Sequence, residues 1–104
     1  MSTSKRLVAL EKMTAGGKGD ALTLYGLAME YRSLGRIDEA EQAFVALRDH
    51  DPGYVPTYYQ AGALLLAAGR PADARVWLEQ GIVTARAKGD THALGEIEQL
   101  LQGA

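Results

Sequence analysis

The dipeptide Gly-Arg occurs twice in this chain at a spacing of 34 positions, as Gly35-Arg36 and Gly69-Arg70. The sequence around the two copies repeats with the same 34-residue spacing, and comparing residues 21–54 with residues 55–88 gives five identities. They are Thr23 and Thr57, Tyr25 and Tyr59, Gly35 and Gly69, Arg36 and Arg70, and Ala40 and Ala74. A unit this short cannot bury an apolar face by itself, so neighbouring units must stack. The repeat therefore predicts a stacked architecture.

Apolar residues recur at helical spacing between the glycine and proline breaks. The breaks fall at Gly16-Gly17, Gly35, Pro52-Gly53, Gly69 and Gly89, and the segments between them, roughly 11 to 18 residues long, suit helices. The inward stripes are Leu7, Leu10, Met13; Leu24, Leu27, Ala28, Tyr31; Ala40, Ala43, Phe44, Leu47; Tyr58, Ala61, Gly62, Leu65; Ala74, Trp77, Leu78, Ile82; and Leu94, Ile97, Leu101. No segment alternates strictly enough for a strand, so we expect an all-α protein of about six helices.

Several residues are suited to the ends of these helices. Asp20 and Asp90 are expected N-caps, and Pro71 suits a first helical turn, where its missing N–H would be unpaired anyway. Gly35 and Gly69 stand where a helix ends and the chain must take a left-handed conformation. The repeated Gly-Arg is therefore first of all a tight turn between antiparallel helices.

The order of large, small and turn residues resembles the tetratricopeptide repeat. The residues that show it are Leu24, Leu27, Ala28, Tyr31, Gly35, Ala40, Phe44 and Pro52 in one unit, and Tyr58, Gly62, Leu65, Gly69, Ala74 and Leu78 in the next. The second unit departs from the pattern, because Arg86, Ala87 and Lys88 stand in place of the closing proline. The resemblance implies a right-handed α-solenoid of antiparallel helix pairs, in a small protein that acts as an interaction module.

We expect one domain, residues 1–104, in four parts. Residues 4–14 form an N-terminal half-repeat helix, 21–54 repeat 1, 55–88 repeat 2, and 91–102 a C-terminal capping helix with a polar outer face. Lys18-Gly19-Asp20 recurs as Lys88-Gly89-Asp90, seventy positions on instead of sixty-eight. The helix that holds Trp77 is therefore expected to be slightly longer than its counterpart.

The composition favours some classes of partner over others. Lysine and arginine number 11 and aspartate and glutamate 13, a formal charge of −2, and the signs alternate without a basic stripe. Nucleic acid is therefore not an expected partner. No cysteine is present, no apolar run is long enough to span a bilayer, and the start is too short for a secretory signal, so we expect no membrane partner and a cytoplasmic location.

Residues that could support catalysis or metal binding are few. His50 lies between Asp49 and Asp51, and His92 and Glu96 have the i, i+4 spacing that can bind a metal, but neither set has a visible third ligand. Ser33 and Thr84 have no visible base partner, and the glycine run around Lys18 lacks phosphate-loop spacing. We expect no enzymatic activity, no metal and no cofactor.

A second face on the first helix of each pair is the candidate binding site. It comprises Leu22, Tyr25, Met29 and Arg32 in the first repeat and Tyr59, Ala63 and Leu66 in the second. The resemblance implies that this face lines a concave surface that grips a peptide or protein. The alternative is that Tyr25 and Tyr59 pack against each other along the stack. The lysine and asparagine clamp by which some family members hold chaperone tails is absent, because Tyr25, Met29, Tyr59 and Ala63 stand at the matching places.

Two hypotheses of function remain open. The first is a non-catalytic adaptor that binds a protein or peptide with the concave face. The second is a homo-oligomeric structural module that forms a homo-dimer through the same apolar face. Residues 61–68 are apolar nearly all round, which implies burial on more than one side and could leave that helix partly bare in so thin a stack.

Overall fold

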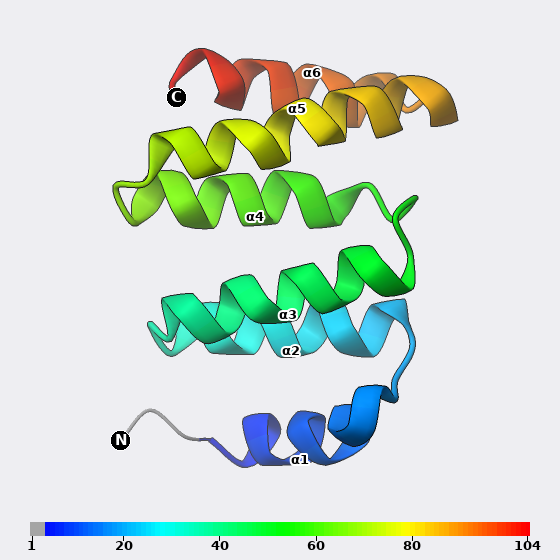
Figure 1. The fold of residues 1–104 in the computed structure, drawn as a ribbon, viewed down its shortest axis with the longest axis vertical. Coiled ribbons are helices and arrows are strands. Elements are labelled where there is room, and N and C mark those ends of the chain that lie inside the picture. Colours follow the sequence, from blue (N-terminus) through cyan, green and yellow to red (C-terminus); the bar gives the residue numbers. More distant parts are fainter. Residues whose placement is uncertain (1–3) are drawn as a thin grey trace. The chain divides into compact units, whose positions relative to one another are not determined.

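The computed structural model describes residues 4–104, and all the regular structure in that range is helical (Figure 1). The helices are α1 (Lys5–Thr14), the 3₁₀ turn η1 (Ala15–Gly17), α2 (Ala21–Ser33), α3 (Ile37–His50), α4 (Pro56–Ala67), α5 (Pro71–Lys88) and α6 (Thr91–Gln102). Residues 4–104 contain six α-helices and no strand, so the expected all-α class and helix number are confirmed. The predicted longer helix is also confirmed, because α5 has 18 residues and α3 has 14.

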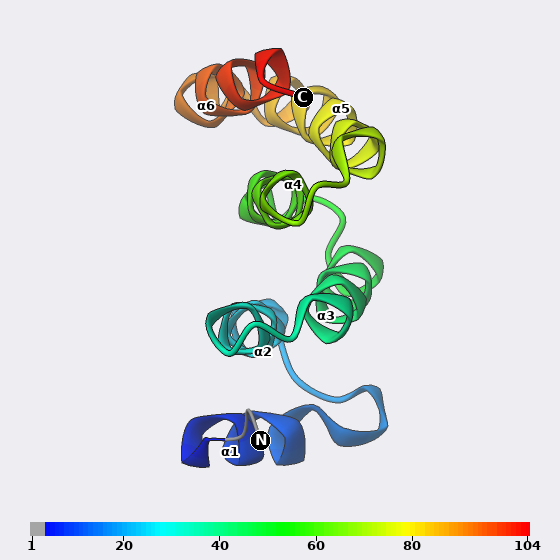
Figure 2. The same ribbon diagram turned by 90° about the vertical axis from the view of Figure 1, so that its left-hand side faces the viewer.

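The helices form two compact units, Met1–Asp51 and Pro52–Ala104, called here the N-terminal and C-terminal units. In the N-terminal unit α2 and α3 pair antiparallel and α1 packs against α2 (Figure 2). In the C-terminal unit α4 and α5 pair in the same way, and α6 packs against both. Each unit is thus one helix pair with one additional helix.

The two Gly-Arg turns have the same geometry. Gly35 and Gly69 take φ values of 73° and 75°, a left-handed conformation that glycine adopts without the steric cost of a side chain. The arginine that follows begins the next helix and pairs with the carboxylate three residues on. Arg36 Nε lies 2.6 Å from Glu39 Oε1, and Arg70 Nε lies 2.9 Å from Asp73 Oδ2. The repeated dipeptide is therefore a turn and a helix start.

The expected N-caps are also present. The Asp20 carboxylate accepts a hydrogen bond from the Thr23 amide at 2.8 Å, and the Asp90 carboxylate accepts one from the Ala93 amide at 3.0 Å. Pro71 lies in the first turn of α5, as predicted. These ends fix where α2, α5 and α6 begin.

The core of the N-terminal unit follows the predicted stripes, except that Leu10 and Tyr31 are only half-buried and Met13 is exposed. Its buried apolar residues are Leu7, Leu24, Leu27, Ala28, Ala40, Ala43, Phe44 and Leu47. Met13 was expected inside and is 55% exposed, so that prediction is wrong. Leu10 and Thr14, four residues apart, lie on the inward face of α1, and Met13 lies beside that face. The Thr14 hydroxyl donates a hydrogen bond to the Leu10 carbonyl at 2.9 Å.

Two glycines set the close packing of the C-terminal unit. A Cβ at Gly62 of α4 would lie 2.4 Å from Leu78 Cδ2, and a Cβ at Gly81 of α5 would lie 2.6 Å from Tyr58 Cβ. Ile97 of α6 would be 3.0 Å from that same added atom. The predicted inward stripes include Gly62 but not Gly81, which occupies the repeat position of Leu47. Gly81 is thus where α4 and α6 both approach α5.

Candidate functional site

The predicted face of α2 comprises Leu22, Tyr25, Met29 and Arg32, called here the α2 patch. These residues lie on one side of the helix by their spacing, while Leu24, Leu27 and Ala28 are buried. Leu22 is 70% exposed and the other three are half-buried. The α2 patch therefore presents one mostly exposed apolar side chain, Leu22, beside the half-buried Tyr25 and Met29.

Helix α1 packs beside this patch. Leu10 Cδ2 would lie 3.6 Å from a Cβ at Gly26, and the Ser4 hydroxyl donates to Glu30 Oε2 at 2.9 Å. The side of α2 that carries Gly26 and Glu30 is therefore occupied by α1. The α2 patch lies on the neighbouring side of the helix.

The predicted face of α4 comprises Tyr59, Ala63 and Leu66, called here the α4 patch, and all three are half-buried. Tyr59 and Leu66 pack against the buried cluster of Val55, Leu78, Ala85 and Ile97. Two residues of the α4 patch therefore also support the core, which was not predicted. That the α2 and α4 patches form one continuous surface stays a prediction.

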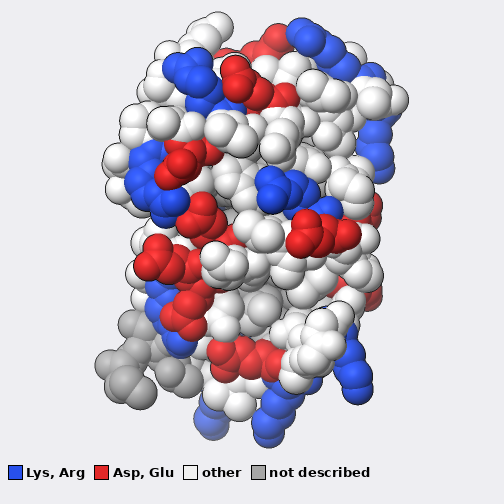
Figure 3. Space-filling view, in the orientation of Figure 1, with Lys and Arg blue, Asp and Glu red and all other residues white. Residues whose placement is uncertain are grey.

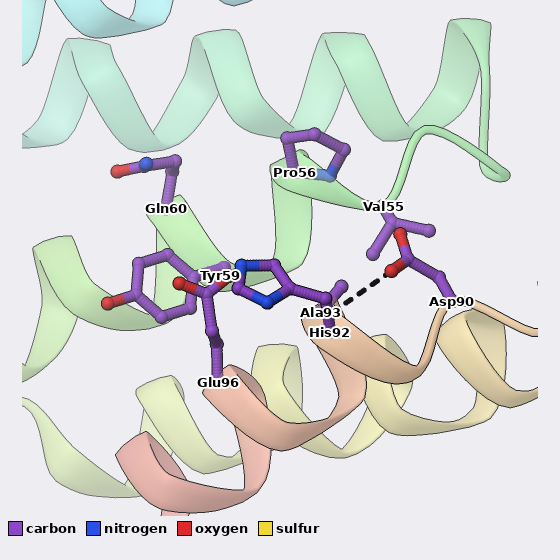
Figure 4. Close-up of a pocket in the computed structure, with 8 residues that line it drawn as sticks. All are labelled: Val55, Pro56, Tyr59, Gln60, Asp90, His92, Ala93 and Glu96. Carbon is purple, nitrogen blue, oxygen red and sulfur yellow. Dashed lines mark hydrogen bonds and ion pairs between the residues drawn. The ribbon is translucent and has the colours of Figure 1, made fainter.

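Tyr59 also lines a hollow between α4 and α6, called here the α4–α6 groove (Figure 4). The hollow measures about 280 Å³ and is lined by Val55, Pro56, Tyr59, Gln60, Asp90, His92, Ala93 and Glu96. A second hollow of about 200 Å³ is lined by Tyr59, Glu96, Gln99 and Leu100. Tyr59 and Glu96 belong to both. Tyr59 was predicted as a site residue, but α6 was predicted only as a cap. The signal in the sequence that could have indicated this groove is the i, i+4 spacing of His92 and Glu96.

The electrostatics of this groove are simple. His92 Nε2 lies 3.5 Å from Glu96 Oε1, with the two side chains 87% and 51% exposed. Asp90 uses its carboxylate as the cap of α6. None of the lining residues is a lysine or arginine. The groove is therefore an acidic hollow with an aromatic wall.

The N-terminal unit has a hollow of its own. It measures about 610 Å³, has an apolar floor that includes Leu24 and Leu27, and has Thr14, Gln42, Asp49 and His50 among its polar lining residues. His50 is exposed there. The pKa of Asp20 is lowered mainly by hydrogen bonds from Thr23, and nearby His50 has the smallest effect, in the same direction. His50 is at a helix end, as expected.

The other candidate residues have local roles. The Ser33 hydroxyl donates to the Glu30 carbonyl at 3.0 Å, and the Thr84 hydroxyl to the Gln80 carbonyl at 2.9 Å. Between Ser4 and Ala104, no group of three or more His, Cys, Asp or Glu residues could hold a metal ion. A search of the same residues finds no helix long and apolar enough to cross a membrane. On the face drawn in Figure 3, acidic and basic side chains are intermixed.

The apolar stretch 61–68 is less bare than expected. Ala61, Gly62, Leu64 and Leu65 are buried, and only its last residues, Ala67 and Ala68, are exposed. The large apolar side chains most exposed in the C-terminal unit lie instead on α5, where Val76 is 53% and Val83 is 68% exposed. The most exposed large apolar side chains of this unit therefore lie on α5 and not on α4.

The chain is similar to known tetratricopeptide proteins over most of its length. The family model described as tetratricopeptide repeat matches residues 31–94. A TPR repeat-containing protein of Pseudomonas aeruginosa is 36% identical over 93 residues, which is 89% of each chain. Two solved structures share the fold. A Bordetella parapertussis protein superposes with a TM-score of 0.79 at 28% identity, covering 96% of this chain and 87% of that one. A tetratricopeptide repeat domain protein of Salinibacter ruber gives 0.76 at 34%, covering 81% and 85%. The chain therefore belongs to the tetratricopeptide repeat family, whose members serve generally as non-catalytic protein-interaction modules.

Proposed function

We propose that this protein is a non-catalytic adaptor that binds a protein or peptide through the α2 patch and the α4 patch. The observation that supports this most is Leu22, which is 70% exposed beside half-buried Tyr25 and Met29. Tyrosine gives a large contact area with a polar end, and methionine adapts its packing to the partner. These three residue types on one helix face suit a contact surface better than a solvated one.

The α4 patch supports the same proposal in a different way. Tyr59 is half-buried and lines both hollows beside α6, so part of its ring is available to a partner. Its inner part contacts the core cluster and holds the ring in place. A ring that is already fixed loses little side-chain entropy on binding, which favours affinity.

The non-catalytic part of the proposal rests on the candidate residues themselves. Ser33 and Thr84 donate their hydroxyl hydrogens to backbone carbonyls of their own helices. His92 and Glu96 form one exposed pair. An acid–base or nucleophilic site needs a reactive group held beside a base and a third orienting group, and these residues do not supply that arrangement.

The direct test is affinity capture from the native host with the wild-type chain and the double variant Tyr25→Ala/Tyr59→Ala. The protein retained only by the wild type is then purified and titrated calorimetrically. We expect the double variant to weaken binding by roughly 1–4 kcal/mol, the range for truncating aromatic anchors. Val76→Ala/Val83→Ala on α5 is the matched control, because it removes exposed apolar area outside both patches. Equal loss in the control would contradict the proposal.

Self-association is the second candidate function, supported by the exposed Val76 and Val83 on α5. They are seven residues apart and lie on one face of the helix. Light scattering across a dilution series distinguishes the two functions. A monomer at every concentration removes the homo-dimer, and a dimer abolished by the valine variant but not by the tyrosine variant supports it.

A further inference from the structure

We infer that the α4–α6 groove receives an arginine side chain of the bound protein segment. This inference rests on the proposed function and assigns the chemistry of the partner at one place. The wall made by Tyr59 and Glu96 is the feature that points to it, because an aromatic face and a carboxylate border the same hollow (Figure 4).

The charge balance of the C-terminal unit favours a cation there. Its sequence has four basic residues, Arg70, Arg75, Arg86 and Lys88, and five acidic ones, Asp73, Glu79, Asp90, Glu96 and Glu98, a net charge of 4 − 5 = −1. Arg70 pairs with Asp73 at 2.8 Å, Arg86 lies 3.7 Å from Glu98, and Arg75 donates to the Ala104 carbonyl at 3.0 Å. Asp90 and Glu96 are the two carboxylates that line the groove. The partner is therefore expected to supply the positive charge.

The shape of the groove favours a single long side chain. Its volume, about 280 Å³, lies just below the range of roughly 300–1,000 Å³ typical of small-molecule pockets. Val55, Pro56 and Ala93 offer apolar contacts to a methylene stem, and Gln60 adds a polar edge. A side chain with an apolar stem and a charged end matches a groove that has both apolar and polar lining residues.

Arginine fits the part of the groove formed by Tyr59 and Glu96 better than lysine does. The guanidinium group is planar, so it can stack on the Tyr59 ring and also donate two hydrogen bonds to one carboxylate. Glu96 is available for this role, because its contact with His92 is long at 3.5 Å and exposed to solvent. Exposed pairs of that kind contribute little, so arginine can replace histidine at small cost.

The test is a titration of the ¹⁵N-labelled full chain with a capped tripeptide, leucine–arginine–leucine, at low salt, followed by amide chemical shifts. The comparison peptide has citrulline in place of arginine, which keeps the shape and removes the charge. We expect the arginine peptide to shift the amides of Tyr59, Ala93 and Glu96, and to bind roughly three- to tenfold more tightly than the citrulline peptide.

Glu96→Gln should weaken the arginine peptide roughly two- to fivefold and leave the citrulline peptide unchanged. Glu79→Gln is the matched control, because it removes the same charge from an exposed residue of α5 that lines neither hollow. It should leave both peptides unchanged.

Three results would overturn the inference: equal binding of the two peptides, equal effects of Glu96→Gln and Glu79→Gln, or shifts outside the groove. Equal binding of both peptides within the groove would leave the adaptor function intact and remove only the arginine. The adaptor itself fails separately, if the captured partner binds the Tyr25→Ala/Tyr59→Ala variant as tightly as the wild type.

Discussion

The hydroxyl of Tyr31 donates a hydrogen bond of 2.6 Å to Glu11 Oε2 and so connects α2 to α1. The Arg36 guanidinium lies 5.1 Å from the centre of the same ring and pairs with Glu39 of α3. Burial raises the pKa of Tyr31 to about 12, and the hydrogen bond and charge of Glu11 act in the same direction. This phenol is therefore a reporter of the packing of three helices in the N-terminal unit.

The first prediction concerns the titration of that phenol. Because the Tyr31 pKa is about 12 in the folded chain and near 10 when unfolded, its contribution to stability is complete below pH 10 and is lost as the pH rises toward 12. Tyrosinate absorbance against pH should show one late transition, and Tyr31→Phe should remove it. If the late transition persisted in Tyr31→Phe, another group would be responsible.

The second prediction concerns the two close glycines. Gly81→Ala should destabilise the fold by about 1–3 kcal/mol, because the added Cβ would meet Tyr58 and Ile97. Gly62→Ala should act similarly through Leu78. Gly95→Ala in α6 is the control: a Cβ there meets nothing within 4 Å, so it should stabilise the helix by about 0.5–1 kcal/mol. Urea unfolding measures all three, and a neutral Gly81→Ala would mean that α4 and α5 are farther apart than described.

The third prediction compares two threonines at the same repeat position. The Thr57 side chain is fully buried, and its hydroxyl has no hydrogen-bond partner among the described residues. The equivalent Thr23 interacts through its side chain with Asp20, whose pKa it lowers. Thr57→Val should therefore be neutral or stabilising, whereas Thr23→Val should lower the unfolding temperature, because it removes the side-chain contact with Asp20. Thermal unfolding of the two variants checks this, and a destabilised Thr57→Val would reveal a partner for that hydroxyl.

Features that depend on short-range chemistry could be predicted from the sequence. Gly35 and Gly69 were assigned correctly because a left-handed turn selects glycine, and Asp20 and Asp90 because a cap needs a nearby acceptor. Helical spacing also gave most of the core. It failed at Met13, one position from the inward line that α1 follows.

Features that depend on which helices meet could not be predicted in this way. Gly81 looks like any helical glycine until Tyr58 and Ile97 are brought against it. Tyr59 matches Tyr25 by repeat position, yet it alone packs on the cluster that includes Ile97 of α6. The α4–α6 groove was missed for the same reason, since its two walls come from residues thirty or more positions apart.

The last prediction separates the two tyrosines that the repeat makes equivalent. Tyr25→Ala should reduce partner binding with little effect on unfolding, because Tyr25 lies in the half-exposed α2 patch. Tyr59→Ala should reduce both binding and stability, because the ring also contacts the cluster around Leu78 and Ile97. Its loss of stability should stay below that of Phe44→Ala, a fully buried aromatic whose removal costs roughly 3–5 kcal/mol. Calorimetric titration with the captured partner and urea unfolding of each variant give the two quantities independently. If Tyr25→Ala lost as much stability as Phe44→Ala and kept full binding, Tyr25 would be a core residue and the α2 patch would not be a binding surface.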